Sequence, residues 1–436
     1  MRTLILGGGV TGLAAGCASG LPVFEAAEKP GGICSSYYMR PGSHERLPRS
    51  PSDAEAYRFE IGGGHWIFGG DATVLRFIES LIPTGSYARK SGVWFADEPR
   101  HVPYPLQNHL RFLPPGVACQ AVKEMVTGKT PASPTMQGWL LASFGPTLCE
   151  LFFEPFHDLY TSGLHRQIAP QDGHKSPVDR ALVVAGAFGD VPSVGYNTTY
   201  LYPSEGLDAL AERMAARCDI HCRKRAVKID VHRKRVSFAD GSSEGFQALI
   251  CTLPLNQTMV MAGLTVDEPP DPATSVLVLN LGARRGPRCP DDHWLYHPRT
   301  RAGFHRVGFY SNVDDSFLPR SARDNRDRVS IYVERSFRAG QRPSEAESQR
   351  YAQAVVSELS DWGFIGDVEV VDPTWIDVAY TWGMPGSQWK AKAIASLQSH
   401  DIYMVGRYAR WTFQGIAESI RDGFYAGASF ANRAKS

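Results

Sequence analysis

The sequence predicts an α/β fold in which a Rossmann-like nucleotide-binding domain carries an inserted helical region and a second domain with an antiparallel sheet. Three observations favour this fold class. A buried strand at residues 3–6 runs into glycines and then into a helix, which is the element order that opens a Rossmann-like domain. Residues 117–165 are rich in Leu, Phe and Trp and are typical of core helices. Residues 224–255 and 275–335 contain strand-like runs.

The length and net charge of the chain limit the classes of protein to which it can belong. The 436 residues are too many for one simple core, so we expect two or three interleaved subdomains. The formal net charge is +1, from 46 basic and 45 acidic residues, and gives no electrostatic sign of a nucleic-acid or membrane partner. The sequence lacks a run of about 18 apolar residues, and its N-terminus does not resemble a signal peptide. We therefore expect a cytoplasmic protein of unassigned oligomeric state.

The cysteines do not form a recognisable metal or disulfide motif. Eight are scattered along the chain, and no two form a CxxC pair. Cys218 and Cys222 are the closest pair, but they lack the partner spacing of a zinc site. We expect eight reduced thiols and no bound metal.

A glycine-rich motif follows the first strand and predicts binding of a dinucleotide. Gly7 permits a tight turn, Gly9 lets the backbone approach a pyrophosphate, and Gly12 lets the helix pack close to the strand. The helix begins near Val10 and Thr11, where free N–H groups and a partial positive charge face the phosphates. Strand, glycines and helix occur in the order that this motif requires.

The segments after this motif favour FAD over NAD. The second strand ends in Glu25, whose carboxylate can accept hydrogen bonds from both hydroxyls of a ribose. Gly31 and Gly32 form a second glycine turn, and a further glycine loop contains Gly64 and His65. An isoalloxazine ring lies beyond the pyrophosphate and needs small residues against its face, whereas NAD enzymes do not need these loops. The sequence therefore predicts non-covalently bound FAD.

The C-terminal end of the chain is expected to complete the cofactor site. A strand at 402–405 runs into Gly406 and Arg407, and Gly415 with Ile416 starts the final helix. The N-terminus of that helix can face the flavin N1–C2=O edge, where negative charge collects on reduction. One further expected cofactor contact lies in the middle of the chain, at Val227.

These elements divide the chain into three expected parts. The discontinuous FAD-binding domain comprises residues 1–75, 204–262 and 396–436. The mainly helical insertion comprises residues 100–190. The substrate domain with the antiparallel sheet comprises residues 76–99, 191–203 and 263–395.

Several motifs further along the chain suggest a family. They are G-G-H at 63–65, H-V-P-Y-P-L-Q-N at 101–108, R-Q-I-A-P at 166–170, G-Y-N-T-T-Y-L-Y-P at 195–203, W-L-Y at 294–296, F-H-R-V-G-F-Y-S-N at 304–312, and G-R at 406–407 followed by Trp411. Together they resemble the UDP-galactopyranose mutases, especially the eukaryotic type. That family belongs to the superfamily of amine oxidases and protoporphyrinogen oxidases, and the resemblance implies an FAD-binding domain of the GR2 type.

The resemblance implies roles for the residues at matching positions. Arg166 and Arg306 match the two active-site arginines of the family, and His65 matches the histidine that lies against the flavin. Arginine suits a leaving diphosphate because its guanidinium is permanently charged and bidentate. The expected substrate contacts are Tyr104, Gln107, Asn197, Tyr296 and Phe413.

Two positions depart from the family pattern. The family uses two further tyrosines on the substrate diphosphate, and we place Met384 and Phe413 where they belong. Both phenol hydroxyls would then be missing. These departures leave open a nucleotide sugar other than UDP-galactose, or a related sugar phosphate.

The resemblance implies a pyranose–furanose mutase of carbohydrate biosynthesis that acts on a nucleotide-diphospho sugar. The N5 atom of reduced FAD would attack the anomeric carbon, and NADPH or NADH would keep the flavin reduced. No second GxGxxG marks a dedicated NADPH fold. Two alternatives stay open: an FAD-dependent oxidoreductase of the amine oxidase or protoporphyrinogen oxidase type, and a flavin-binding scaffold without turnover.

Overall fold

A five-stranded parallel sheet forms the nucleotide-binding part of the molecule in the computed structural model, which describes residues 2–128, 133–171, 178–195 and 197–431. Its strands, in spatial order, are β10 (Ile220–His221), β2 (Val23–Phe24), β1 (Thr3–Leu6), β14 (Ala248–Cys251) and β20 (Ile402–Met404). The central strand β1 is buried on both faces, as is usual for a parallel sheet covered on each side.

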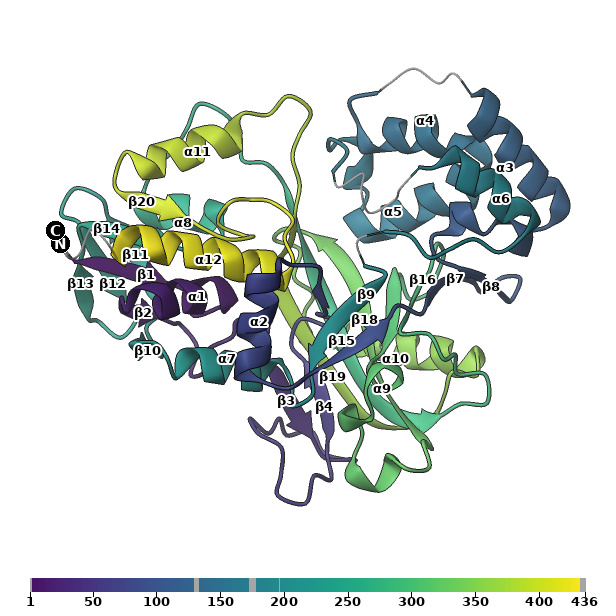
Figure 1. Cartoon of the computed structure of the whole chain (residues 1–436), viewed down its shortest axis with the longest axis horizontal. Coiled ribbons are helices and arrows are strands. Elements are labelled where there is room, and N and C mark those ends of the chain that lie inside the picture. The colour runs from purple at the N-terminus through teal and green to yellow at the C-terminus, as the bar shows by residue number, and fades with distance from the viewer. Residues whose placement is uncertain (1, 129–132, 172–177, 196, 432–436) are drawn as a thin grey trace.

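Different layers cover the two faces of this sheet. Ile5 packs with Ala15 of α1 (Val10–Ser19) and Phe430 of α12 (Ile416–Ala431), whereas its neighbours Leu4 and Leu6 point into a core on the opposite face. The opposite face is covered by α8 (Leu255–Ala262), α11 (Trp389–Gln398), and the antiparallel strands β11 (Ala226–Asp230), β12 (Arg235–Phe238) and β13 (Ser243–Gly245). Figure 1 shows α1 and α12 side by side.

The second part of the molecule is built on a seven-stranded sheet. The strands, in spatial order, are β19 (Ile365–Thr381), β15 (Ala273–Arg285), β18 (Arg328–Arg338), β17 (Arg306–Phe309), β16 (Trp294–Tyr296), β7 (Ser91–Phe95) and β8 (Arg100–Pro103). All neighbouring pairs are antiparallel except β16 and β7. Helix α10 (Glu345–Asp361) packs on one face and begins with a capping box between Ser344 and Glu347.

Smaller strands join the two sheets. They are the pair β3 (Ser36–Met39) and β4 (Tyr57–Glu60), and the three-stranded group β5 (Ile67–Phe68), β9 (Thr199–Pro203) and β6 (Thr84–Ala88). Two short helices lie beside them, α2 (Ala72–Leu81) and α9 (Tyr310–Val313), and α7 (Leu207–Ala215) packs against α1. Aromatic side chains from β4 and β9 fill one shared core, with Phe59 and Tyr202 fully buried.

The helical region forms a separate lobe at one end of the seven-stranded sheet (Figure 1). Its helices are α3 (Pro115–Thr127), α4 (Met136–Leu148), a π-helical turn (Cys149–Phe153), α5 (Glu154–Thr161) and α6 (Arg180–Phe188). Gly145 at φ +75° and Pro146 break the regular geometry of α4. Apolar residues such as Leu140, Phe144 and Phe153 form the core of this lobe.

The predicted fold class is confirmed: the molecule is α/β, with a parallel nucleotide-binding sheet, a helical insertion and a largely antiparallel sheet. Strand β8 occupies the first residues of the region expected to be helical. Among the described residues, no helix is long and apolar enough to cross a membrane.

Candidate active site

A cavity of about 390 Å³ lies where the strands of the parallel sheet end. Gly7 follows β1, Glu25 follows β2, Thr252 follows β14, and Arg407 lies three residues after β20; all four line the cavity. Ligands of open α/β sheets bind in this position, outside the carboxyl ends of the strands. The N-termini of α1 and α12 meet in the same cavity through Val10 and Ile416.

Most of the expected cofactor residues line this cavity. They are Gly7, Gly9, Val10, Thr11, Glu25, Gly31, Gly32, Gly64, His65, Arg407, Gly415 and Ile416. Gly12 and Gly406 lie just behind the lining. A Cβ on Gly12 would come within 1.9 Å of the Gly7 carbonyl oxygen, and one on Gly406 would lie 2.6 Å from Thr11 Oγ1. These two glycines therefore shape the cavity by letting backbone segments and side chains pack closely behind its lining.

Val227 stays a predicted cofactor contact, because the lining of this cavity does not test it. It lies in β11, in the layer on the opposite face of the parallel sheet from α1 and α12. The pairing of β11 with β12 shifts register between Ala226 and Lys228, and the Val227 side chain between them is 49% exposed. It does not line the cavity.

The cavity fits a dinucleotide cofactor such as FAD. Glu25 is buried, and its carboxylate oxygens accept hydrogen bonds from the backbone N–H groups of Gly8, at 2.6 Å, and Ala27, at 2.7 Å. Each oxygen keeps a further lone pair for a ribose hydroxyl. A Cβ on Gly9 would meet no atom closer than 4.0 Å, so it would occupy the space beside α1 that a pyrophosphate needs.

His65 stands in the loop between β4 and β5 and lines the same cavity. Burial, together with the nearby Arg407 guanidinium, lowers the pKa of His65 to about 4. The imidazole is therefore neutral at pH 7 and can affect a bound flavin by hydrogen bonding, without a charge of its own.

A second cavity of about 160 Å³ adjoins the first, between the helical lobe and the seven-stranded sheet. Arg306, Tyr380 and Phe413 line both cavities and so mark their junction. The wall formed by the helical lobe consists of Met136, Trp139, Phe152, Phe153, Phe156, His157 and Tyr160. A molecule in this second cavity would face the cofactor at the junction and aromatic rings on the opposite side.

Arg306 is the charged group at the junction. It begins β17 directly opposite Glu334 of β18, and its Nε and Nη2 donate to that carboxylate over 2.6–3.1 Å. Burial would raise the pKa of Glu334, but the Arg306 and His305 side chains lower it to about 2. Among the described residues, no partner bonds Arg306 Nη1, so its two N–H groups can bind a ligand anion.

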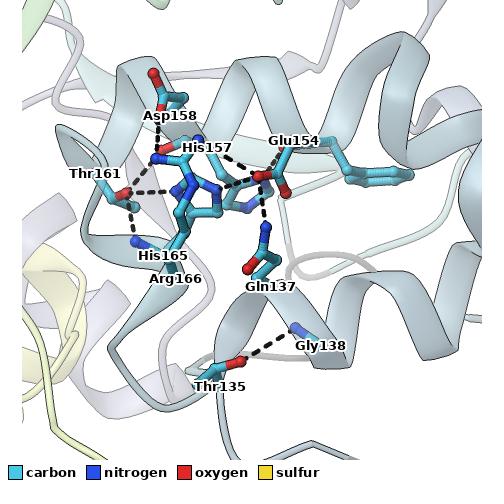
Figure 2. A network of polar contacts seen from close by, with 10 residues as sticks. Thr135, Gln137, Gly138, Glu154, His157, Asp158, Thr161, His165 and Arg166 are labelled. Atoms are coloured by element: carbon cyan, nitrogen blue, oxygen red, sulfur yellow. Dashed lines mark hydrogen bonds and ion pairs between the residues drawn. The ribbon is translucent and has the colours of Figure 1, made fainter.

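Arg166 does not join Arg306, contrary to the prediction. It ends a 3-10 turn (Leu164–Arg166), and its Nη1 lies 2.7 Å from Asp158 Oδ1 while its Nη2 lies 3.5 Å from Glu154 Oε1. Figure 2 shows these ion pairs on the side of α5. The two acids are four residues apart on one helix, so they attract the same guanidinium. Arg166 lines neither of the two cavities.

His157 on α5 is a site residue that the motifs did not identify. Its Nδ1 donates to the Phe153 carbonyl oxygen at 2.7 Å, which leaves Nε2 as a hydrogen-bond acceptor (Figure 2). Burial and the neighbouring His165 and His305 lower the pKa of His157 to about 4, although the Phe153 carbonyl and Glu154 act in the opposite direction. His157 therefore lines the second cavity as a neutral imidazole.

The other expected substrate residues divide into two groups. Tyr104, Asn197, Tyr296 and Phe413 line the second cavity, and the rings of Tyr104 and Tyr296 are 5.0 Å apart. The Asn197 side-chain oxygen accepts a hydrogen bond from Arg89. Gln107 is buried in a 3-10 turn (Leu106–Asn108) and is not among the residues that line either cavity, so its expected contact with the substrate stays a prediction.

The end of β19 also differs from the prediction. Met384 lies after the strand, is 38% exposed and is outside both cavities, so it does not stand at a substrate-binding position. Instead Tyr380 and Trp382 line the second cavity. Their spacing of two residues is the period of a strand, and it was the available signal for this face. The phenol of Tyr380 is therefore present, whereas Phe413 lacks one.

Among the described residues, no group of three or more His, Cys, Asp or Glu side chains is arranged to hold a metal ion.

Fold and site together define a flavoprotein in which a second cavity adjoins the cofactor cavity. The family model described as flavin containing amine oxidoreductase matches residues 20–431. The chain belongs to this family, and FAD is its cofactor. None of the curated proteins compared with the chain matches it.

Solved structures share the whole fold. A reduced UDP-galactopyranose mutase is similar over 100% of this chain and 96% of its own, with a TM-score of 0.84 and 20% identity. An oxidoreductase from Methanosarcina mazei is similar over 97% and 99%, with a TM-score of 0.62 and 14% identity. A CLA-producing fatty acid isomerase from P. acnes is similar over 99% of both chains, with a TM-score of 0.57 and 13% identity. The chain is a flavoprotein with a fold like that of UDP-galactopyranose mutase.

Proposed function

We propose that the chain is an FAD-dependent pyranose–furanose mutase acting on a nucleotide-diphospho sugar. The observation that carries this proposal is the position of Arg306, which lines both cavities and whose Nη1 has no hydrogen-bond partner among the described residues. A guanidinium there attracts the phosphate of a departing nucleotide and repels the ammonium group of an amine substrate. The similarity in fold to UDP-galactopyranose mutase, at a TM-score of 0.84, supports the proposed mutase function.

Reduced FAD supplies a nucleophile, the flavin N5 atom, for the anomeric carbon of the sugar. The protein positions the sugar beside it. Arg306 holds the phosphate that leaves the anomeric carbon, and the phenols of Tyr296 and Tyr380 donate to oxygens of the same ligand. Trp382 and Phe413 present apolar faces that pack against the sugar and exclude water from the reacting carbon.

The wall formed by the helical lobe would hold the nucleotide. His157 offers a neutral acceptor there, and Phe156 and Tyr160 flank it with aromatic faces. Arg306 is the one arginine among the described residues that line the second cavity, so the diphosphate depends strongly on it. We propose NADPH or NADH as the reductant of the flavin.

The test uses the FAD-loaded enzyme reduced with dithionite under anaerobic conditions. It is incubated with UDP-, GDP-, dTDP- and ADP-hexoses, and any flavin–sugar adduct is trapped with cyanoborohydride and identified by mass spectrometry. We expect a furanose product and a trapped adduct from at least one nucleotide sugar, and neither from oxidised enzyme. Absence of both across the panel would overturn the proposal.

A second candidate is an oxidoreductase that uses oxidised FAD. The observation that favours it is the largely aromatic lining of the second cavity, which suits an apolar substrate. An oxidoreductase predicts that a substrate bleaches oxidised flavin without any added reductant. Stopped-flow absorbance with amines, porphyrinogens and free sugars separates this candidate from the mutase, which leaves oxidised flavin unchanged.

A further inference from the structure

Helix α1 carries a cysteine that touches a second cysteine from a distant part of the chain. Cys17 lies in the last turn of α1, and Cys218 follows α7 by three residues. Their sulfur atoms are 3.6 Å apart, although 201 residues separate them in the sequence. Both side chains are partly exposed, so a small oxidant can reach them. The spacing of Cys218 and Cys222 in the sequence gave no sign of this contact.

The packing around the two sulfurs fixes their positions. A Cβ on Gly16 would lie 2.9 Å from Cys218 Sγ, so the missing side chain of Gly16 admits this cysteine. Cys218 Sγ lies 3.3 Å from the Leu13 carbonyl oxygen, and Cys17 Sγ lies 3.4 Å from that of Met214. A disulfide of about 2.05 Å requires the 3.6 Å separation to close by only about 1.5 Å.

The two thiols differ in acidity. Their mutual hydrogen bond lowers the pKa of Cys17, and the nearby Arg217 guanidinium lowers it further, although burial acts in the opposite direction. The same hydrogen bond raises the pKa of Cys218. Cys17 is therefore the more acidic thiol of the pair, as expected of an attacking cysteine, and Cys218 is placed as the resolving cysteine.

We propose that Cys17 and Cys218 form a reversible cross-link between the nucleotide-binding helix and α7 when the protein meets a peroxide. The Cys17 thiolate attacks one oxygen of hydrogen peroxide, the O–O bond breaks, and protonation of the departing hydroxide gives water and Cys17 sulfenic acid. The Cys218 thiol then displaces the sulfenic hydroxyl as a second water, and the S–S bond forms. Two thiols lose two electrons, and the peroxide gains them.

This cross-link bears on the cofactor because α1 begins at the cofactor cavity. It would close a loop that contains the helical lobe, β2 of the parallel sheet, and β7 and β8 of the seven-stranded sheet, and so restrict the unfolded chain. Dioxygen that reoxidises a reduced flavin yields hydrogen peroxide, so the oxidant arises where such an enzyme works. The inference requires only a flavoprotein and does not depend on the mutase activity.

The experiment treats the full-length, FAD-loaded protein with hydrogen peroxide, blocks the remaining thiols and maps the peptides by mass spectrometry. We expect one linked peptide pair that contains Cys17 and Cys218, and loss of two of the eight thiols. Dithiothreitol should restore both thiols. The oxidised protein should unfold at a higher temperature and release FAD more slowly than the reduced protein.

Cysteine-to-serine variants test whether the cross-link forms between Cys17 and Cys218. Cys218→Ser should abolish the linked peptide and the rise in unfolding temperature, whereas Cys119→Ser, at an exposed cysteine, should preserve both. The proposal is overturned if peroxide leaves Cys17 and Cys218 reduced while Cys119 reacts, or if Cys218 links to Cys222 instead. Peptide mapping of the wild-type protein decides between these outcomes even if a variant fails to fold.

Discussion

At the residue scale, the buried pair of Arg306 and Glu334 sets the electrostatics of the site. The carboxylate accepts hydrogen bonds from Nε and Nη2 and so fixes the orientation of the guanidinium of Arg306, which lines both cavities. Removing one member of a buried pair leaves the other charge uncompensated, which costs more than the pair itself contributes. Substitution of either residue should therefore lower stability, and substitution of Arg306 should also lower turnover.

Replacing Arg306 should abolish most of the turnover. Arg306→Ala removes the guanidinium that binds the leaving phosphate, and we expect kcat/KM to fall by at least about 100-fold, the size of one strong transition-state contact. Arg306→Lys should recover little, because an ammonium lacks the bidentate geometry. Steady-state kinetics with reduced enzyme measures this, with FAD absorbance as a check on folding. Arg299→Ala, at an exposed arginine outside both cavities, is the matched control, and an equal loss there would contradict the assignment.

Replacing Glu334 should make stability depend less on pH. Its pKa of about 2 lies below the ordinary value of 4.5, so the ionised carboxylate stabilises the folded protein above about pH 5 and loses this contribution as pH falls toward 2. The shift corresponds to roughly 3 kcal/mol. Glu334→Gln should lower the unfolding temperature at pH 7 and differ less from wild type at pH 4. Thermal unfolding across this range measures the effect; a difference that grows on acidification would contradict it.

At the scale of elements, glycines let two helices approach the sheet and each other. Gly12 brings α1 onto β1, and Gly423 and Gly427 of α12 face the backbone of α1, where a Cβ would come within 2.2–2.3 Å of the carbonyl oxygens of Thr11 and Ala15. This contact places both helix N-termini at one cavity although they are about 400 residues apart in the sequence.

The close contact at Gly12 predicts loss of the cofactor on substitution. Gly12→Ala would place Cβ 1.9 Å from the Gly7 carbonyl oxygen, so α1 must move away from the strand and out of register with the cavity. We expect weaker FAD binding by at least about tenfold, since this corresponds to only about 1.4 kcal/mol of lost interaction. Fluorescence titration of the apoprotein with FAD gives the dissociation constant.

Gly116→Ala is the matched control for this experiment. Gly116 also lies in a helix, α3, but a Cβ there would meet nothing within 4 Å. Alanine should leave FAD binding unchanged and raise stability by about 0.5–1 kcal/mol. Equal losses of FAD in both variants would show that helix propensity, and not the contact at Gly7, controls the cofactor.

At the scale of the whole molecule, both cavities form between parts of the chain that are distant in sequence. The cofactor cavity takes residues from both ends of the chain, and the second cavity takes residues from the helical lobe and from the seven-stranded sheet. A ligand that binds only the folded state stabilises it by an amount that grows with the logarithm of the free ligand concentration relative to the dissociation constant.

Removal of FAD should therefore lower the stability of the whole folded protein. At a free FAD concentration about 100 times its dissociation constant, the bound form gains about 2.7 kcal/mol over the apoprotein. We expect the apoprotein to unfold at a lower temperature and to be cleaved faster by trypsin near both termini. Added FAD should reverse both changes, and unchanged cleavage would contradict a cofactor site that joins the two ends.

The sequence by itself was enough to predict most residues that line the cofactor cavity. Gly7 to Gly12, Glu25 and the glycine turn at Gly31 are local signals, because each acts through its own backbone or through the end of its own strand. The same holds for Arg407 and Ile416 at the start of the final helix. Local geometry sufficed to predict this cavity, and motif order sufficed to predict the family.

Only the tertiary structure decided the substrate side. Arg166 is drawn to Glu154 and Asp158 on α5, Gln107 is buried, and Tyr380 with Trp382 lines the cavity in place of Met384. These outcomes depend on which elements pack together and on which side chains compete for one partner. The contact of Cys17 with Cys218 has the same origin, since it arises where α1 and α7 meet. A sequence motif gives the spacing of residues along the chain, whereas a binding site depends on which residues the tertiary structure brings close together in space.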